Sequence, residues 1–319
     1  MSIISIMAKS RRAFIGGQAV VEGVMFRSPH AYAVAVRSPA GEIITEAREH
    51  SSLTSKSPWK LPFIRGAVTL YESLALGYKA LMFSAEIAEP REEGEERRKA
   101  SFWEKAGLIA FSLTFGLLLF VGVPYGAAYL LKGPLGVTTE GSVVFNVIDG
   151  LLRVVVFFGY LLAISTLKDI RRMFAYHGAE HKVINTYEHG REPRAENVPA
   201  ASRFHPRCGT SFIIVLLLIL IIFHSVIFSI LPADLHFLMK LLVRLALIIP
   251  ITGVAYELIR LGSRFPDNKI INFFLFPGMV TQFLTTREPD GDMIEVALSS
   301  FRRVQEEESV GGGTSEAGD

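Results

Sequence analysis

The chain has 319 residues, half of them hydrophobic, with a formal net charge of +2 and a single cysteine. The small net charge gives no support for nucleic-acid binding, and one cysteine excludes an intramolecular disulfide framework. The length allows more than one structural unit, and the apolar residues are distributed unevenly along it.

Residues 13–100 are predicted to form a cytoplasmic N-terminal region of mixed α and β structure. The stretch Gly16–Met25 is predicted as one strand, with glycines where backbones approach closely. Two further β-prone runs, Ala31–Arg37 and Glu42–Arg48, are joined by the sequence Ser-Pro-Ala-Gly. Proline second and glycine fourth suit a type I turn, so these two runs are predicted to form a β-hairpin.

The segment 62–88 is predicted to be helical and is largely apolar. Its charged residues recur every seven positions, which puts them on one narrow stripe of the helix; they are Arg65, Glu72, Lys79 and Glu86. Such a helix is expected to lie in the membrane interface or to pack against membrane helices with one wet edge. A fifth span is disfavoured because it would carry charges across the hydrocarbon. Residues 89–99 form a charge-dense linker.

Four strongly apolar segments follow, and two of them, Leu108–Leu131 and Ser211–Leu231, contain no Asp, Glu, Lys or Arg. A helix of about 20 apolar residues crosses the hydrocarbon core of a bilayer. Soluble proteins can also bury apolar helices, but their cores rarely contain uncharged runs of this length. We therefore predict transmembrane helices near residues 107–131, 144–167, 211–231 and 236–258, in a bundle assigned to 101–260 together with the connecting loop 168–209.

The connecting loops differ in charge. The loop 132–143 has one basic residue and 232–235 has none, whereas the loop 168–209 has eight. The positive-inside rule places this basic loop and both termini in the cytoplasm, where it would meet anionic lipid headgroups. Residues 1–7 are too short for a signal peptide. These features predict a multi-pass protein of the cell (inner or plasma) membrane with the lipid bilayer as its partner.

The C-terminal region, residues 261–308, is predicted to contain two short elements. Ile270–Leu284 is apolar but is predicted to be broken by Pro277-Gly278, and at about 15 residues it is short for a span, so it is expected to be interfacial or re-entrant. Met293–Glu308 is predicted to be an amphipathic helix, and the Gly-rich tail 309–319 to be disordered.

The side chains with metal-binding chemistry gather between the second and third predicted spans. His177, His181, His205 and the only cysteine, Cys208, fall within 32 residues. Imidazole and thiolate are the groups that bind zinc-like ions, and two His four apart on a helix point the same way. These four residues are therefore predicted to hold a divalent metal ion, zinc by preference.

No proline occurs between Val143 and Gly190, so the second span is predicted to continue into the cytoplasm as one helix. On that helix His177, His181, Asn185 and Glu188 share one face.

The order His-x-x-Glu-His at 177–181 also occurs in inverted zinc-protease motifs, where both His bind the metal and the Glu is a general base. Glu180 is the corresponding candidate base. Those enzymes need a third ligand from far downstream, for which Glu257 is a candidate. Glu22 and Glu72 are further reserve ligands, because a carboxylate in apolar surroundings needs a partner. Without a metal, they would form ion pairs that fix the N-terminal region.

Several hypotheses for this cluster stay open. Four ligands would make a closed structural site, whereas three would leave a position for water and suit catalysis. Without a metal, the histidines would serve as hydrogen-bonding groups at the bilayer edge and Cys208 as a packing residue. The first hypothesis is a metal-dependent hydrolase with a membrane-associated substrate. The second is a non-catalytic scaffold or assembly factor in which the cluster is a structural clasp. A transporter is disfavoured by the few ionisable groups in the spans.

Several sequence blocks together resemble the bacterial YqhQ-like family, over residues 14 to 300. The blocks are 16–25, 176–182, 196–198, 205–212 and 284–290. That family consists of multi-pass membrane proteins of unknown function, described as predicted metal-dependent enzymes because of these same His, Glu and Cys motifs. The resemblance implies a bacterial inner-membrane protein in which all the blocks belong to one fold, and it brings no substrate or reaction.

The predicted fold is therefore a mainly α-helical integral membrane protein with about four transmembrane helices. A small N-terminal α+β cytoplasmic region with a β-hairpin precedes them.

Overall fold

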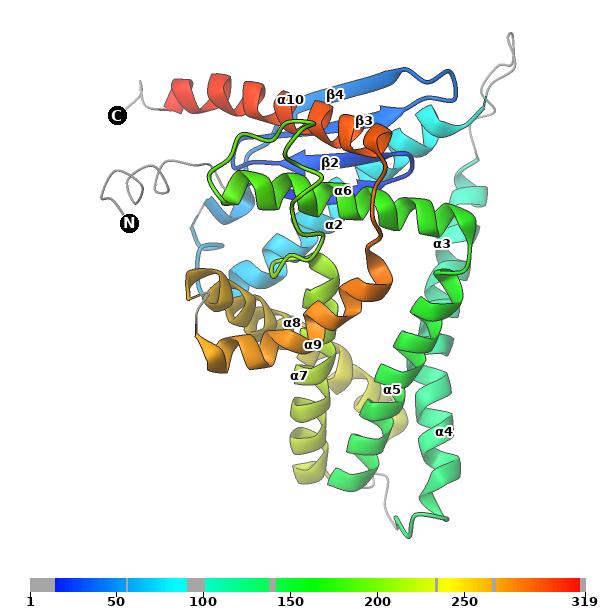
Figure 1. Cartoon of the computed structure of the whole chain (residues 1–319). Helices are drawn as coiled ribbons and strands as arrows, with labels where there is room; N and C mark the ends of the chain where they lie inside the picture. Colours follow the sequence, from blue (N-terminus) through cyan, green and yellow to red (C-terminus); the bar gives the residue numbers. More distant parts are fainter. Residues whose placement is uncertain are drawn as a thin grey trace. The chain divides into compact units, whose positions relative to one another are not determined.

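The computed structural model describes residues 15–55, 57–90, 101–137, 142–232, 235–265 and 268–315 (Figure 1). The chain divides into two compact units, each discontinuous in sequence. The first unit contains residues 1–90, 165–208 and 279–319, and the second contains 91–164 and 209–278. The segment after the second span, assigned above to the membrane bundle, thus groups with the N- and C-terminal regions.

A four-stranded antiparallel sheet in the order β1-β2-β3-β4 forms the centre of the first unit. The strands are β1 (Gly16–Val20), β2 (Gly23–Arg27), β3 (Ala31–Arg37) and β4 (Ile43–Glu49). The predicted hairpin is confirmed, since Ala31 of β3 pairs with Glu49 of β4 and the Gly41 amide donates to the Ser38 carbonyl in the turn. The prediction of one strand over 16–25 is wrong: the chain reverses at Val21 and Glu22, so β1 and β2 form a second hairpin.

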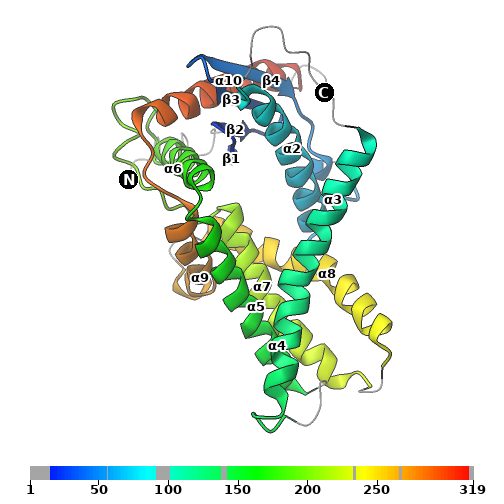
Figure 2. The same cartoon turned by 90° about the vertical axis from the view of Figure 1, so that its right-hand side faces the viewer.

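The side chains of these strands alternate between two buried faces, as the pleat of a strand requires. Phe26 and the alanines of β3 pack beneath α6 (Lys168–Glu188) and α10 (Gly291–Ser315). Val34 and Val36 face the opposite way and pack against Leu76 of α2 (Ile64–Ala88). The first unit therefore has three layers, with α2 on one face of the sheet and α6 and α10 on the other (Figure 2).

Helix α2 confirms the helix predicted over 62–88, but its packing partner is the sheet. Glu72 does not lie on a wet edge: it is buried and accepts hydrogen bonds from the Ser52 hydroxyl, at 2.9 Å, and from the Leu53 amide. Leu53 begins the short 3-10 helix η1 (Leu53–Ser55). The carboxylate therefore anchors the connection between the sheet and α2.

Helix α10 packs through residues three or four apart, which form one apolar stripe. Within it Phe301 meets Phe26 of β2 edge to face, with ring centroids 5.4 Å apart. The helix runs to Ser315, so residues 309–315 of the predicted disordered tail are helical. The last residues, 316–319, lie outside the described part of the chain.

The second unit is built of apolar helices. They are α3 (Phe102–Leu117), the π-helical turn η2 (Leu118–Gly122), α4 (Val123–Lys132), α5 (Val143–Ile164), α7 (Gly209–Ile230), α8 (Phe237–Arg264) and the first part of α9 (Lys269–Thr285). Four stretches are long and apolar enough to cross a membrane: Ala106–Lys132, Val143–Ile164, Gly209–Phe228 and Leu238–Gly262. The four predicted spans are confirmed.

Two helix predictions are wrong, and the first concerns the second span. The second span does not continue to Gly190, because α5 ends at Ile164 and α6 begins at Lys168. Between them Leu167 is extended, with ψ of 135°, and Ser165 and Thr166 precede it. Short hydroxyl side chains compete for backbone hydrogen bonds and so favour helix ends even without a proline.

Pro277 and Gly278 do not break the apolar segment after α8. Pro277 lies inside α9, which is continuous from Lys269 to Thr285. A Cβ atom at Gly278 would lie 2.8 Å from the Ser211 carbonyl oxygen, so the glycine permits close packing of α9 against the start of α7. The pair thus serves helix packing, and α9 is not among the four candidate spans.

Candidate metal centre

Helix α6 is buried along most of its second half and uses two faces. Its apolar residues, among them Ala179 and Val183, pack in the core with the sheet and α10. The polar residues at 177, 181, 185 and 188 face the segment 199–208, as predicted from their spacing. Gly178 permits a further contact, because a Cβ atom there would overlap the backbone carbonyl of Arg287.

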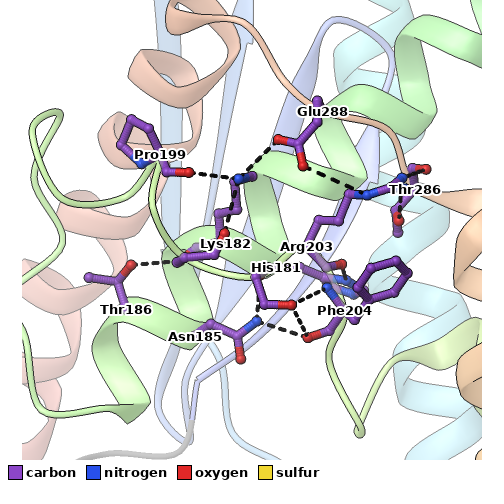
Figure 3. A network of polar contacts seen from close by, with 11 residues as sticks. His181, Lys182, Asn185, Thr186, Pro199, Arg203, Phe204, Thr286 and Glu288 are labelled. Atoms are coloured by element: carbon purple, nitrogen blue, oxygen red, sulfur yellow. Dashed lines mark hydrogen bonds and ion pairs between the residues drawn. The ribbon is translucent and has the colours of Figure 1, made fainter.

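The segment 199–204 is held on α6 by hydrogen bonds to its carbonyl groups. The buried Lys182 ammonium donates to the carbonyls of Pro199 and Ala201 at 2.8 and 2.9 Å. The Asn185 amide donates to those of Ser202 and Phe204 at 2.6 and 3.0 Å (Figure 3). These contacts fix the backbone on both sides of Arg203.

Residues 286–288 complete this network. Glu288 lies 3.0 Å from the Lys182 ammonium and 3.8 Å from the Arg203 guanidinium. Arg203 also donates to the carbonyl of Thr286 (Figure 3). The segment after α9 is thereby tied to the same stretch of chain that α6 holds.

The two histidines of α6 are oriented by backbone carbonyls. His177 Nδ1 lies 2.8 Å from the Thr285 carbonyl oxygen, and His181 Nδ1 lies 2.6 Å from that of Arg203. A carbonyl only accepts, so each Nδ1 carries the proton, and in the neutral ring Nε2 is left with its lone pair. In each ring Nε2 is therefore the nitrogen that can serve as a ligand atom once it carries no proton.

These Nε2 atoms converge on Cys208. His177 Nε2 lies 3.2 Å from Cys208 Sγ, and one ligand atom from each of His177, His181 and Cys208 lies within 4.8 Å of the others. His181 is 1% exposed, and its Nε2 has no hydrogen-bond partner among the described residues. Two imidazoles and a thiol, with a buried nitrogen left unpaired, suit a zinc-like ion.

His205 lies nearby but is turned away from this group. Its ring centroid is 5.7 Å from that of His181, while its Nε2 lies 3.2 Å from the Glu188 carboxylate. Gln282 holds its backbone, accepting from the His205 amide at 2.8 Å and donating to its carbonyl at 2.7 Å. Of the four predicted ligands, the structure brings three together and directs the fourth toward Glu188.

The charges of the three grouped residues depend on one another. Burial lowers the pKa of His177, but the neighbouring Cys208 thiolate raises it more strongly, to about 9. Burial raises the pKa of Cys208, but His177 holds it well below the usual range. Burial, with the charge of His177, lowers the pKa of His181. The thiol is therefore poised to be a thiolate, the form that binds metals.

Glu180 lies on the side of α6 that faces β1. A Cβ atom at Gly17 would lie 2.6 Å from Glu180 Cγ, so any larger residue at position 17 would displace the Glu180 side chain. Burial raises the pKa of Glu180 to about 8, with His177 opposing the shift and Cys208 adding to it. A carboxyl group with a pKa near neutrality can both take up and release a proton.

The three reserve carboxylates are Glu22, Glu72 and Glu257. Glu22 accepts from the guanidinium of Arg172, at 2.6 Å from Nη2, and from the Tyr176 hydroxyl at 3.3 Å. It thus ties the β1–β2 turn to α6 as an ion pair. Glu72 anchors η1 as described above, and Glu257 lies on α8 in the second unit.

Several residues that shape the centre were not singled out from the sequence. The carbonyls of Arg203 and Thr285 orient the two histidines. Every residue has a backbone carbonyl, so the residue type does not reveal which carbonyls act in this way. Gly17, Gln282 and Lys182 act through contacts with distant segments. The signal that pointed to some of them was the family resemblance, whose blocks include Gly17, Lys182 and Thr285.

Comparisons with known proteins agree with that resemblance. Residues 61–307 match a family described as "Protein of unknown function (DUF1385)". The chain is 35% identical over 300 residues to the "Uncharacterized protein YqhQ" of Bacillus subtilis (strain 168), covering 91% of each chain. No solved structure matches.

Proposed function

We infer the activity of this chain from its site, because the chain belongs to the DUF1385 family of YqhQ-like proteins, whose function is unknown. We propose that it is a membrane metalloprotein in which His177, His181 and Cys208 hold a divalent ion, zinc by preference. The supporting observation is the buried, unpaired Nε2 of His181 beside the His177–Cys208 pair.

The way the two histidines are held supports this proposal. Metal-binding histidines usually donate their second ring N–H to a carbonyl or carboxylate, which fixes the tautomer and the ring orientation. The Thr285 and Arg203 carbonyls have this position relative to His177 and His181. A buried nitrogen without a partner costs about 1–3 kcal/mol, and a bound ion would remove that cost.

The number of ligands favours catalysis over a purely structural role. Catalytic zinc sites have three protein ligands and an open position, and structural sites have four. An ion held by these three residues would supply a Lewis acid that polarises a carbonyl or phosphoryl oxygen. Glu180 would move the proton, as its pKa of about 8 allows. We propose hydrolysis as the reaction.

The membrane context suggests the substrate and the compartment. Cys208 directly precedes α7, one of the four candidate spans, so the proposed substrate is membrane-associated. The eight basic residues of 168–209 favour a cytoplasmic position of the centre and of both termini, in the cell membrane.

Metal analysis of the freshly purified protein tests the proposal. We expect about one zinc ion per chain, lost in His177→Ala, His181→Ala and Cys208→Ala, and retained in His205→Ala as the matched control. A wild type that neither contains nor takes up metal would refute the proposal, and so would full occupancy in His181→Ala.

A structural clasp is the second candidate, because the three ligands come from two separate segments that an ion would cross-link: α6 and the residue before α7. X-ray absorption distinguishes the two functions. A fourth protein ligand and no water would support the clasp, and three protein ligands with water would support the enzyme.

A further inference from the structure

The second unit holds a buried aspartate, Asp149, and partly buried basic side chains at one level of its membrane helices. Asp149 lies six residues after the start of α5, Arg244 seven after the start of α8, and His224 six before the end of α7. With a rise of 1.5 Å per residue, each of the three lies about 10 Å from that end of its helix. The connection 133–142 leads into this end of α5, and the connection 231–236 joins the ends of α7 and α8.

Asp149 and Arg153 form a bidentate ion pair within α5. The Nε and Nη2 atoms of Arg153 donate to both carboxylate oxygens of Asp149 at 2.9 to 3.2 Å. The remaining Nη1 donates to the Phe120 carbonyl at 2.9 Å. Phe120 lies in the π-helical turn η2, a local irregularity of the kind that often occurs at functional sites. Arg153 therefore uses all three of its nitrogens and neutralises Asp149.

Arg244 is held less closely by the same carboxylate. Its Nη1 lies 3.8 Å from Asp149 Oδ2, beyond hydrogen-bond distance, and its Nε is buried with no hydrogen-bond partner in the part of the chain that the structure describes. Its guanidinium instead lies over two rings, 5.1 Å from that of Phe228 and 5.7 Å from that of Tyr125. Two arginines against one aspartate leave one positive charge uncompensated (+2 − 1 = +1).

His224, whose Nε2 is a second unpaired nitrogen among the described residues, lies beside the same ring. His224 packs edge to face on Phe228, with centroids 5.9 Å apart, and its Nε2 is buried with no hydrogen-bond partner among the described residues. An arginine at this depth is costly unless it is paired, and intramembrane ionisable residues are often functional. The cluster thus has one positive charge and two unused nitrogen groups, which an anion would satisfy.

We propose that Arg244, with His224 beside it, binds the singly charged phosphate group of a ligand between the membrane helices. The planar guanidinium matches two oxygens of a phosphate, and one negative charge would neutralise the cluster. The ligand is either the headgroup of an anionic phospholipid, with no cation to offset its phosphate charge, or inorganic phosphate, since both bring a net negative charge. The site is independent of the metal centre, which lies in the other unit.

Thermal unfolding in a neutral, phosphate-free detergent tests the proposal with three additions: phosphatidylglycerol, phosphatidylcholine and inorganic phosphate. We expect phosphatidylglycerol or phosphate, but not zwitterionic phosphatidylcholine, to raise the unfolding midpoint of the wild type. A rise with phosphatidylglycerol alone identifies a lipid ligand, and a rise with phosphate identifies the free anion. No rise with either overturns the proposal.

Two variants with opposite expectations, Arg244→Gln and Asp149→Asn, and one control variant make the test specific. Arg244→Gln should weaken the apparent affinity about tenfold or more, whereas Arg260→Gln, an exposed arginine of the same helix, should not. Asp149→Asn frees Arg153 as well and should strengthen binding, which a merely structural pair would not do. Unchanged affinity in Arg244→Gln overturns the proposal; if that variant does not fold, unchanged affinity in Asp149→Asn does so.

Discussion

The Nε2 atom of His177 lies 3.2 Å from the Sγ atom of Cys208, although 31 positions separate the two residues. After α6 the chain turns back along the polar face of that helix. This return brings Cys208 beside His177 just before α7 begins. The hydrogen bonds of Lys182 and Asn185 to the returning segment hold it there. The centre is therefore supported mainly by backbone carbonyls.

The contact between Gly17 and Glu180 gives a test of the packing around the candidate base. Gly17→Ala would place a methyl group 2.6 Å from Glu180 Cγ. We expect it to destabilise the protein by about 1–3 kcal/mol, because overpacking displaces the buried carboxyl. A lowered thermal unfolding midpoint measures this effect.

The neighbouring Gly16 is the matched control, since a Cβ atom there meets nothing within 4 Å. Gly16→Ala should leave the midpoint nearly unchanged. In a Glu180→Ala background the effect of Gly17→Ala should largely disappear, because the two sites are in direct contact. An equal effect of Gly17→Ala in both backgrounds would mean that Glu180 is not what the methyl group meets.

Asn185 is predicted to act on metal affinity without being a ligand. Its amide holds the Ser202 and Phe204 carbonyls on either side of Arg203, whose own carbonyl orients His181. Asn185→Leu should weaken zinc affinity by about 10–100-fold with all three ligands present. Competition with a chromophoric chelator measures the affinity.

Asn197 provides the comparison for this variant. It lies in the same connection but bonds to Glu192 and Arg194, away from the histidines. Asn197→Ala should keep wild-type affinity. If Asn185→Leu also keeps it, the orientation of His181 does not depend on the Asn185 contacts.

Glu308 is predicted to give the first unit a pH-dependent stability. Burial raises the pKa of its carboxyl, but hydrogen bonds from Ser28 and His30 lower it more, to below the ordinary 4.5. The folded state thus binds the proton more weakly than the unfolded state. The stabilisation is complete above about pH 4.5 and is lost as the pH falls through the folded value.

Glu308→Gln should therefore lower the stability by about 1–2 kcal/mol at pH 7 and by progressively less at acid pH, below about 4.5, measured by thermal unfolding. The control is Glu306→Gln, whose carboxylate pairs with Arg303 at the surface; it should have little effect at either pH. A penalty for Glu308→Gln that is constant with pH would contradict the assigned ionisation.

The membrane orientation predicts the labelling of introduced cysteines. In a Cys208→Ser background, Leu135→Cys follows the first span and Arg191→Cys follows α6. An impermeant thiol reagent should label Leu135→Cys on intact cells and Arg191→Cys only after permeabilisation, because the basic connection is expected inside. The reverse pattern would place the metal centre outside.

Local features of the fold were predictable from the sequence, and contacts between distant segments were not. The β3–β4 hairpin follows from a four-residue turn, and the four spans follow from uninterrupted apolar residues. The end of α5 was missed because a serine, a threonine and a leucine at 165–167 carry no strong breaker signal. Pro277, a strong breaker signal, was misleading because it lies within a helix.

The sequence by itself determined that the protein is a membrane protein with a His/Cys cluster, because hydrophobic length and side-chain chemistry belong to the residues themselves. Only the tertiary structure decided which side chains meet. It directs His205 to Glu188, leaves His177, His181 and Cys208 together, and closes the group with the Thr285 and Arg203 carbonyls. These contacts depend on packing between segments that are far apart in the chain, and a local sequence pattern contains no information about such packing.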